Sequence, residues 1–188
     1  DWSSDVCSSD LLVDVGASYA NYASDLTRTY PVSGRFTPRQ RAVYDAVLRV
    51  LRGAIARTTV GTRLRDWKRA AQVDMAQELV GLGLITVEQA ARDSAEEPAC
   101  KRYFMHGLGH SLGLGVHDLA PVDGPLEAGW VMTVEPGIYI PEEGLAVRLE
   151  NDILVTEHGP VDLTSHVPLE PDEIEGLMAR PAAAGGRV

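Results

Sequence analysis

Strand-like runs lie at both ends of this chain and helical patterns lie between them, an order that restricts the fold more than any other feature. Apolar runs at 11–15 and 26–32, joined by small, turn-prone residues, predict a β-hairpin. Thr37 and Pro38 are typical of a helix N-cap and first turn, and an apolar stripe with four-residue spacing follows them. This stripe predicts a long helix and consists of Val43, Val47, Leu51 and Ile55.

Two further helices are expected before the chain returns to strands. One runs from about residue 64 to residue 80, where Gly81 and Gly83 end it, and a shorter one follows Thr86. The later strands are expected at 131–134, 137–140 and 145–155. A hairpin, then helices, then several strands make an α+β pattern, and 188 residues suit one hydrophobic core.

Composition excludes several classes of partner. The net charge of −10, without any cluster of Lys and Arg, makes nucleic acid a poor ligand. No apolar run approaches the roughly 20 residues that cross a bilayer, so we expect no membrane span. The two cysteines, Cys7 and Cys100, are too few for a disulfide framework, which fits a reducing compartment and a cytoplasmic location.

Four acidic residues occur in or beside apolar, strand-like runs, where charge is normally excluded. They are Asp14, Asp25, Glu135 and Glu150. Ion pairs with Arg28 and Arg148 would explain one or two of these acids, but four together strain that explanation. If all four converge, their mutual repulsion would raise their pKa values unless cations neutralise them, and two divalent ions would do so.

Three of the five histidines lie within the segment HGLGHSLGLGVHD, whose glycines allow sharp backbone turns. These are His106, His110 and His117. A single histidine is more often a core residue, but three among small residues favour a site. The chain has no HExxH and no GxSxG motif, which argues against a helical zinc protease and a serine hydrolase. Two Asp, two Glu and a His suit hard ions such as Mn²⁺, with Co²⁺, Fe²⁺ or Zn²⁺ as alternatives.

Five motifs in order resemble those of the M24 metallopeptidases, specifically the aminopeptidase P branch. They are LLVDVG, ASDLTRTYPVSGRFTPRQRAVYDAVL, FMHGLGHSLGLGVHD, TVEPGIYI and VRLENDILVT. The resemblance covers nearly everything after Leu11 and implies the α+β pita-bread (creatinase/aminopeptidase) fold. It also implies a dinuclear metal centre whose ligands are Asp14, Asp25, His110, Glu135 and Glu150.

The resemblance gives each ligand a place in that centre. In the family, Asp14 is bidentate to one ion, and Asp25 and Glu150 bridge both ions. His110 and Glu135 complete the other ion. We therefore expect two divalent cations as cofactors, with Mn²⁺ as the first choice.

The implied reaction removes the N-terminal residue from peptides with proline in the second position, by a hydroxide that bridges the two metal ions. Glu135 is the expected proton shuttle to the leaving nitrogen. His106 and His117 are expected to hydrogen-bond the substrate and stabilise the tetrahedral oxyanion, and Arg148 to orient a ligand carboxylate. The alternatives are an Xaa-Pro dipeptidase (prolidase), which shares the five ligands, and a non-catalytic binding module with the same fold.

The first residues do not read as the start of a protein. Residues 1–11, DWSSDVCSSDL, have no Met or basic flank, and their back-translation resembles a sequencing-library adapter. We expect a non-native segment at 1–11, a partial M24 catalytic domain at 12–177 and a flexible tail at 178–188. The fold should then be incomplete at its N-terminal side, where the family carries a further catalytic histidine. We expect this chain to be weakly active or inactive, and the full-length protein to be a homo-oligomer.

Overall fold

The computed structural model describes residues 10–121 and 123–179, in which helices lie against several small antiparallel sheets. The helices are α1 (Pro38–Ala56), α2 (Leu64–Gly81), α3 (Val87–Ala90) and α4 (Pro171–Met178), with a 3-10 turn at Pro141–Glu143. The strands are β1 (Asp10–Val15), β2 (Ser18–Tyr19), β3 (Tyr22–Ala23), β4 (Leu26–Pro31), β5 (Ser111–Leu112), β6 (Val131–Val134), β7 (Gly137–Ile140), β8 (Leu145–Arg148), β9 (Asn151–Thr156) and β10 (Gly159–Asp162). Among these residues no helix has the length and apolarity that crossing a membrane requires.

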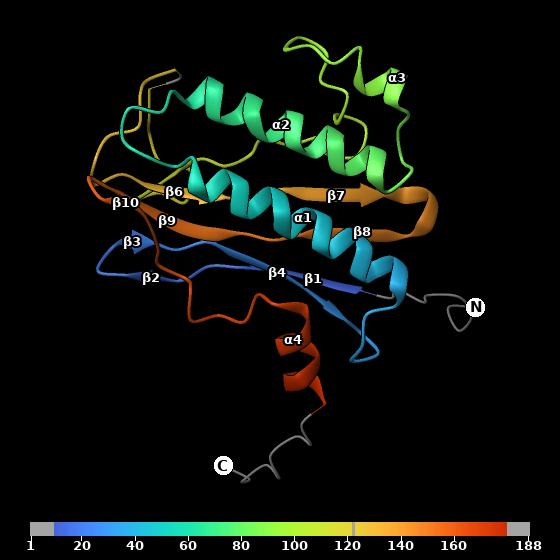
Figure 1. Cartoon of the computed structure of the whole chain (residues 1–188). Coiled ribbons are helices and arrows are strands. Elements are labelled where there is room, and N and C mark those ends of the chain that lie inside the picture. The colour runs from blue at the N-terminus through green and yellow to red at the C-terminus, as the bar shows by residue number, and fades with distance from the viewer. Residues whose placement is uncertain (1–9, 122, 180–188) are drawn as a thin grey trace, which may run out of the picture.

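The strands pair in four separate sets. Strands β10, β9, β6 and β5 form a four-stranded sheet in that order, and β7 pairs with β8 beside it. Strands β1 and β4 form the predicted hairpin, whose connecting segment contains the small β2–β3 pair. Figure 1 shows α1 and α2 above strands β6 to β9, and the β1–β4 hairpin below them. The four-stranded sheet and the β7–β8 pair thus lie between the two long helices and the β1–β4 hairpin.

The first long helix begins and packs as its sequence predicts. The Thr37 side chain accepts a hydrogen bond from the Gln40 backbone N–H, and the Gln40 side chain accepts one from the Thr37 N–H. This capping box satisfies two donors that the first turn leaves unpaired. The apolar stripe of α1 is buried in the main core, and Trp67 of α2 donates from Nε1 to the Ala54 carbonyl at 3.1 Å. The two helices therefore form one rigid layer.

The predicted strand at 145–155 is in fact two strands. Strand β8 pairs with β7 and strand β9 pairs with β6, so the chain changes partner at Leu149 and Glu150. Three polar residues at 150–152 coincide with this break, but apolar residues resume at Ile153, and the prediction ran a single strand through them. The break places Glu150 between two sheets rather than within one.

Several elements are absent from the prediction. The short strands β2, β3 and β5, strand β10 and helix α4 were not expected, and α4 reaches Met178, the first residue of the expected tail. The rest of that expected tail, from residue 180 onward, lies outside the described residues, as do residues 1–9 of the expected non-native segment. Asp10 and Leu11, at the end of that segment, pair with Pro31 and Tyr30 in the β1–β4 hairpin.

Candidate metal centre

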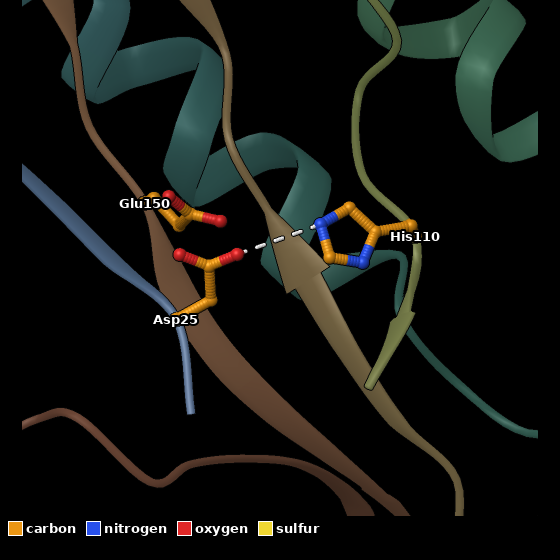
Figure 2. A group of neighbouring side chains, drawn as sticks. All are labelled: Asp25, His110 and Glu150. Atoms are coloured by element: carbon orange, nitrogen blue, oxygen red, sulfur yellow. Dashed lines mark ion pairs between the residues drawn. The ribbon is translucent and has the colours of Figure 1, made fainter. Parts of the chain in front are cut away.

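Three side chains that are distant in the sequence meet at the ends of strands. Asp25 lies directly before β4, His110 directly before β5, and Glu150 between β8 and β9, as Figure 2 shows. One possible ligand atom of each residue lies within 4.8 Å of those of the other two. Carboxylate oxygens and imidazole nitrogens are suitable donors for divalent cations. These three residues can therefore hold a metal ion.

His110 presents one ring nitrogen to the acids. Its Nε2 lies 3.6 Å from Asp25 Oδ2 and 3.7 Å from Glu135 Oε1. Its Nδ1 lies 3.1 Å from the Ser111 carbonyl oxygen, which can only accept, so Nδ1 is the donor of this hydrogen bond. One face of the His110 ring stacks on the ring of His117, with 3.8 Å between the ring centroids and 14° between the ring planes. The Nε2 lone pair is thereby directed at the carboxylates, as a metal ligand requires.

Glu150 carries an unsatisfied oxygen inside the protein. Its Oε2 accepts a hydrogen bond from the Thr27 hydroxyl at 2.5 Å, whereas Oε1 is buried and has no hydrogen-bond partner among the described residues. Burial raises the pKa of Glu150 to about 8, although the Thr27 hydrogen bond opposes this shift. A buried acceptor without a partner costs free energy, and a cation beside Oε1 would remove that cost. The donor set of the site therefore fits a divalent ion.

The neighbouring carboxyl groups are also shifted toward their neutral forms. Burial raises the pKa of Glu135 to about 7, although the Arg148 guanidinium opposes this shift. Burial, and then the negative charge of Asp14, raise the pKa of Asp25. Carboxylates that crowd together cannot all ionise at low cost, and divalent cations would reverse this effect. Asp14 and Glu135 thus belong to the same electrostatic cluster as the three residues of Figure 2.

Arg148 links the cluster to its surroundings. Its Nη2 forms an ion pair with Asp14 Oδ2, its Nη1 donates to the Tyr139 hydroxyl at 3.0 Å, and its Nε lies 3.2 Å from the Thr27 hydroxyl. Thr27 in turn donates to Glu150, so one guanidinium is connected to two of the predicted ligands. A planar group with several donors can hold such side chains in fixed relative positions.

His106 lies at the end of this network. Its Nδ1 is 2.8 Å from the Gly107 carbonyl oxygen and therefore donates, which leaves Nε2 to accept from the Tyr139 hydroxyl at 2.8 Å. Burial lowers the pKa of His106, which favours this neutral ring. The hydroxyl of Tyr139 accepts from Arg148 and donates to His106. A continuous chain of hydrogen bonds thus runs from Asp14 to His106.

All of the predicted site residues lie in this cluster or contact it. Arg28, which was considered together with Arg148 as an ion-pair partner of the acids, does not pair with a carboxylate among the described residues. Arg28 is buried and donates to the backbone carbonyls of Thr27, Glu150, Val167 and Pro168. It therefore stabilises the backbone around Glu150 rather than the carboxylates. Of the two arginines considered as possible ion-pair partners of the acids, Arg148 pairs with Asp14, whereas the described residues give Arg28 only backbone acceptors.

Sequence reasoning missed four residues that contact the site. They are Thr27, Thr133, Tyr139 and Asp152, which lie within or beside the motifs that were identified, but Thr and Tyr are ordinary strand residues and carry no signal of their own. Asp152 accepts the Asp25 N–H at 3.1 Å through Oδ2, and burial raises its pKa to about 6. Asp152 also interrupts an apolar run, so the criterion that selected Glu150 could have found it.

An α+β frame that gathers four carboxylates and a histidine around unsatisfied buried oxygen is the arrangement of a metallohydrolase. Residues 6–157 match metallopeptidase family M24, which is most of the chain. The chain belongs to this family.

Curated relatives give a narrower comparison. The chain is 44% identical over 186 residues to Xaa-Pro aminopeptidase 2 of Streptomyces coelicolor, covering 90% of this chain and 39% of the relative. It is 41% identical over 182 residues to Xaa-Pro aminopeptidase of Escherichia coli, covering 89% of this chain and 40% of the relative. The chain therefore spans about two fifths of the length of these relatives.

Solved structures agree with the fold expectation. Proline aminopeptidase P II from Yersinia pestis superposes with a TM-score of 0.83 at 41% identity, covering 90% of this chain and 42% of that one. A zinc-substituted E. coli aminopeptidase P in complex with product gives a TM-score of 0.82 at 39% identity, covering 92% and 42%. The predicted pita-bread α+β fold is thereby confirmed.

Proposed function

We propose that the protein containing this chain is a metal-dependent aminopeptidase that removes the N-terminal residue from peptides with proline in the second position. The observation that carries this proposal is the meeting of Asp25, His110 and Glu150 around a buried carboxylate oxygen that has no hydrogen-bond partner within residues 10–121 and 123–179. Membership of family M24 and the identity to Xaa-Pro aminopeptidases support the reaction and the substrate class.

We assign two divalent cations to the cluster, with Mn²⁺ as the first choice because the donors are hard oxygens and one imidazole. The residues that would hold them are Asp14, Asp25, His110, Glu135 and Glu150. Such a pair of cations supplies Lewis acidity, which activates a water molecule and polarises the scissile carbonyl.

Glu135 is the side chain best suited to move the proton. Its pKa near 7, caused mainly by burial, allows the carboxyl group to hold and release a proton near neutral pH. Its Oε1 lies 3.7 Å from the Nε2 of His110, so it faces the same space as the other ligands. In this proposal Glu135 delivers the proton to the leaving proline nitrogen.

The two histidines outside the ligand set face the substrate in different ways. His117 is exposed and stacks on His110, so its ring nitrogens are accessible beside the centre. The Nε2 of His106 accepts a hydrogen bond from the Tyr139 hydroxyl, which is in turn oriented by Arg148. We assign His117 to stabilisation of the oxyanion, and His106 to a hydrogen bond with the substrate after exchange of its present partner.

Metal stoichiometry tests the proposal most directly. The chain, stripped with chelator and dialysed against excess Mn²⁺, should retain two equivalents by elemental analysis, and the Asp25→Asn and Glu150→Gln variants should retain fewer. Failure of the unsubstituted chain to bind any of the four candidate metals would contradict the proposal and favour a binding module.

Substrate length separates the two enzymatic alternatives. Release of the first residue from an Xaa-Pro-Xaa tripeptide, followed by mass spectrometry, is the expected reaction. Cleavage of the Xaa-Pro dipeptide alone would instead identify a dipeptidase. A cytoplasmic location and a homo-oligomeric state of the whole protein stay predictions, supported by the low cysteine content and by the resemblance respectively.

A further inference from the structure

Two buried polar residues face each other on neighbouring strands behind the candidate metal centre. Thr133 of β6 is directly opposite Asp152 of β9 in the antiparallel register, and their relative exposures are 0% and 3%. On one side of this pair the register continues with two apolar pairs, Met132 with Ile153 and Val131 with Leu154, and on the other side Val134 lies opposite Asn151. A polar pair in such a position is costly unless its atoms have partners, so the partners indicate its purpose.

Each member of the pair binds the backbone of a different predicted ligand. The Thr133 hydroxyl oxygen accepts the His110 N–H at 3.0 Å, and the Thr133 N–H donates to the His110 carbonyl at 2.9 Å. Asp152 Oδ2 accepts the Asp25 N–H at 3.1 Å. The two side chains therefore act on two segments that are 85 residues apart in sequence but whose ligand atoms lie 3.6 Å apart.

Both ligands lie just outside a strand. Asp25 precedes β4 by one residue and His110 precedes β5 by one residue. The backbone hydrogen bonds of these strands therefore do not by themselves fix the positions of the two residues. The hydrogen bonds from Asp25 and His110 to buried side chains replace ladder contacts at these positions. Mutation of a residue that orients a metal ligand by a hydrogen bond typically lowers metal affinity 10- to 100-fold.

We propose that Thr133 and Asp152 are a pair of positioning residues that hold His110 and Asp25 at the separation required for metal binding before any metal is present. This inference rests on the proposed function, since it concerns the same centre. Neither residue needs to contact a metal or a substrate, because each acts through the backbone of a ligand.

Thr133 allows a test without any change of charge. Thr133→Val keeps the shape of the side chain but removes the acceptor, and is expected to weaken Mn²⁺ binding about 10-fold or more, as measured by calorimetry. Thr133→Ser retains the hydroxyl and should restore binding. Thr58→Val is the matched control, because Thr58 is also fully buried and its hydroxyl donates to Ala54 in α1.

Asp152 requires its charge to be separated from its position. Asp152→Asn removes the charge but keeps an oxygen that can accept the Asp25 N–H, whereas Asp152→Ala removes both. The difference in Mn²⁺ affinity between these two variants therefore measures the effect of the hydrogen bond to Asp25 without the effect of the charge. Asp152→Ala should bind Mn²⁺ about 10-fold more weakly than Asp152→Asn. Asp93→Ala and Asp93→Asn are the controls, because Asp93 is a mostly buried acid that accepts the Ala99 N–H at 2.7 Å outside the centre.

A second measurement reads the contacts directly in the metal-free chain. The amide ¹H shifts of Asp25 and His110 should move upfield in Asp152→Ala and Thr133→Val respectively, and stay near their original values in the Asn and Ser variants. Thermal unfolding of every variant identifies any that fails to fold, in which case the milder Asn and Ser variants and their amide shifts decide the question.

The outcomes separate this inference from the proposed function. Tight Mn²⁺ binding by the unsubstituted chain, together with equal affinity in Thr133→Val and Asp152→Ala, would overturn the positioning role alone. Unchanged amide shifts would overturn it as well. Absence of Mn²⁺ binding by the unsubstituted chain would contradict the proposed function, and the inference would fall with it.

Discussion

The imidazole rings of His110 and His117 stack nearly parallel, with 3.8 Å between their centroids. One ring is a predicted metal ligand and the other is exposed beside it, so a loop rich in glycine brings a ligand and a candidate catalytic group into contact. Mutation of each histidine can therefore separate metal binding by His110 from the proposed catalytic role of His117.

In the full-length protein that contains this chain, replacement of His117 by alanine should lower kcat for an Xaa-Pro peptide by about 100-fold, because one donor to the oxyanion is lost. Metal content should fall far less, since Asp25 and Glu135 still face His110. Elemental analysis beside a peptidase assay measures both quantities, with His158→Ala in an exposed turn as the control. Equal losses of activity and metal would contradict the assigned role.

Removal of metal should make stability depend on pH. Because burial raises the pKa of Glu150 to about 8 and of Glu135 to about 7, both groups favour the folded chain when protonated. This contribution is complete below their unfolded values near 4.5 and is lost as pH rises through 7 and 8. We expect the metal-free chain to lose about 2 kcal/mol of unfolding free energy between pH 6.5 and 8.5.

Urea unfolding in the presence of a chelator measures this loss, and saturating Mn²⁺ should abolish it because bound cations favour the ionised carboxylates. Glu150→Gln should flatten most of the pH dependence in the chelated chain while weakening metal binding. A chelated chain whose stability is constant across this range would show that the carboxyl groups titrate normally.

Conservative replacement of Arg148 by lysine should be damaging. Lysine cannot contact Asp14, Tyr139 and Thr27 at once, so the positions of Asp14 and Glu150 would be less restricted. We expect Mn²⁺ affinity to fall about 10- to 100-fold by calorimetry. Arg49→Lys, which alters a surface ion pair with Glu78, should leave the affinity unchanged, and equal effects of the two substitutions would refute this role for Arg148.

Substitution of Gly109 by alanine should disturb the site through the backbone. A Cβ at this position would lie 2.0 Å from the Thr133 carbonyl oxygen and 3.1 Å from the Trp67 ring, so the segment that carries His110 must shift. We expect destabilisation of about 1–3 kcal/mol in urea together with weaker Mn²⁺ binding. Gly81→Ala, at the end of α2 with open space around its Cβ, should be neutral or stabilising.

Most of the frame was predictable from local patterns. The capping box at Thr37 and the stripe from Val43 to Ile55 gave α1, and alternating turn and apolar segments gave the β1–β4 hairpin and strands β6 and β7. The split of the strand at 145–155 was not predicted, because the change of partner at Glu150 depends on long-range pairing and the prediction included the polar residues at 150–152 in one strand. Strand β10 was missed because its sequence, GPVD, begins with Gly and Pro, which are typical of turns, and helix α4 was missed as well.

The site divides along similar lines. Asp14, Asp25, Glu135 and Glu150 were found because charge in an apolar run is unusual, and His110 because it recurs with two other histidines among glycines. Their role as ligands came from the family resemblance and stays a prediction until metal is measured. Asp152 could have been found by the criterion that found Glu150, but its position opposite Thr133 depends on the register of β6 against β9, which only the three-dimensional arrangement reveals.

Arg28 ties the far end of the chain to its centre. Its guanidinium binds the carbonyl of Glu150 on one side and those of Val167 and Pro168 on the other. Separating the segment after β10 from the body of the protein would strand a positive charge in the interior with half of its acceptors gone. A proteolytic cut near residue 167 should therefore make the backbone around Glu150 less rigid, although the cut lies in a loop that contains none of the predicted ligands.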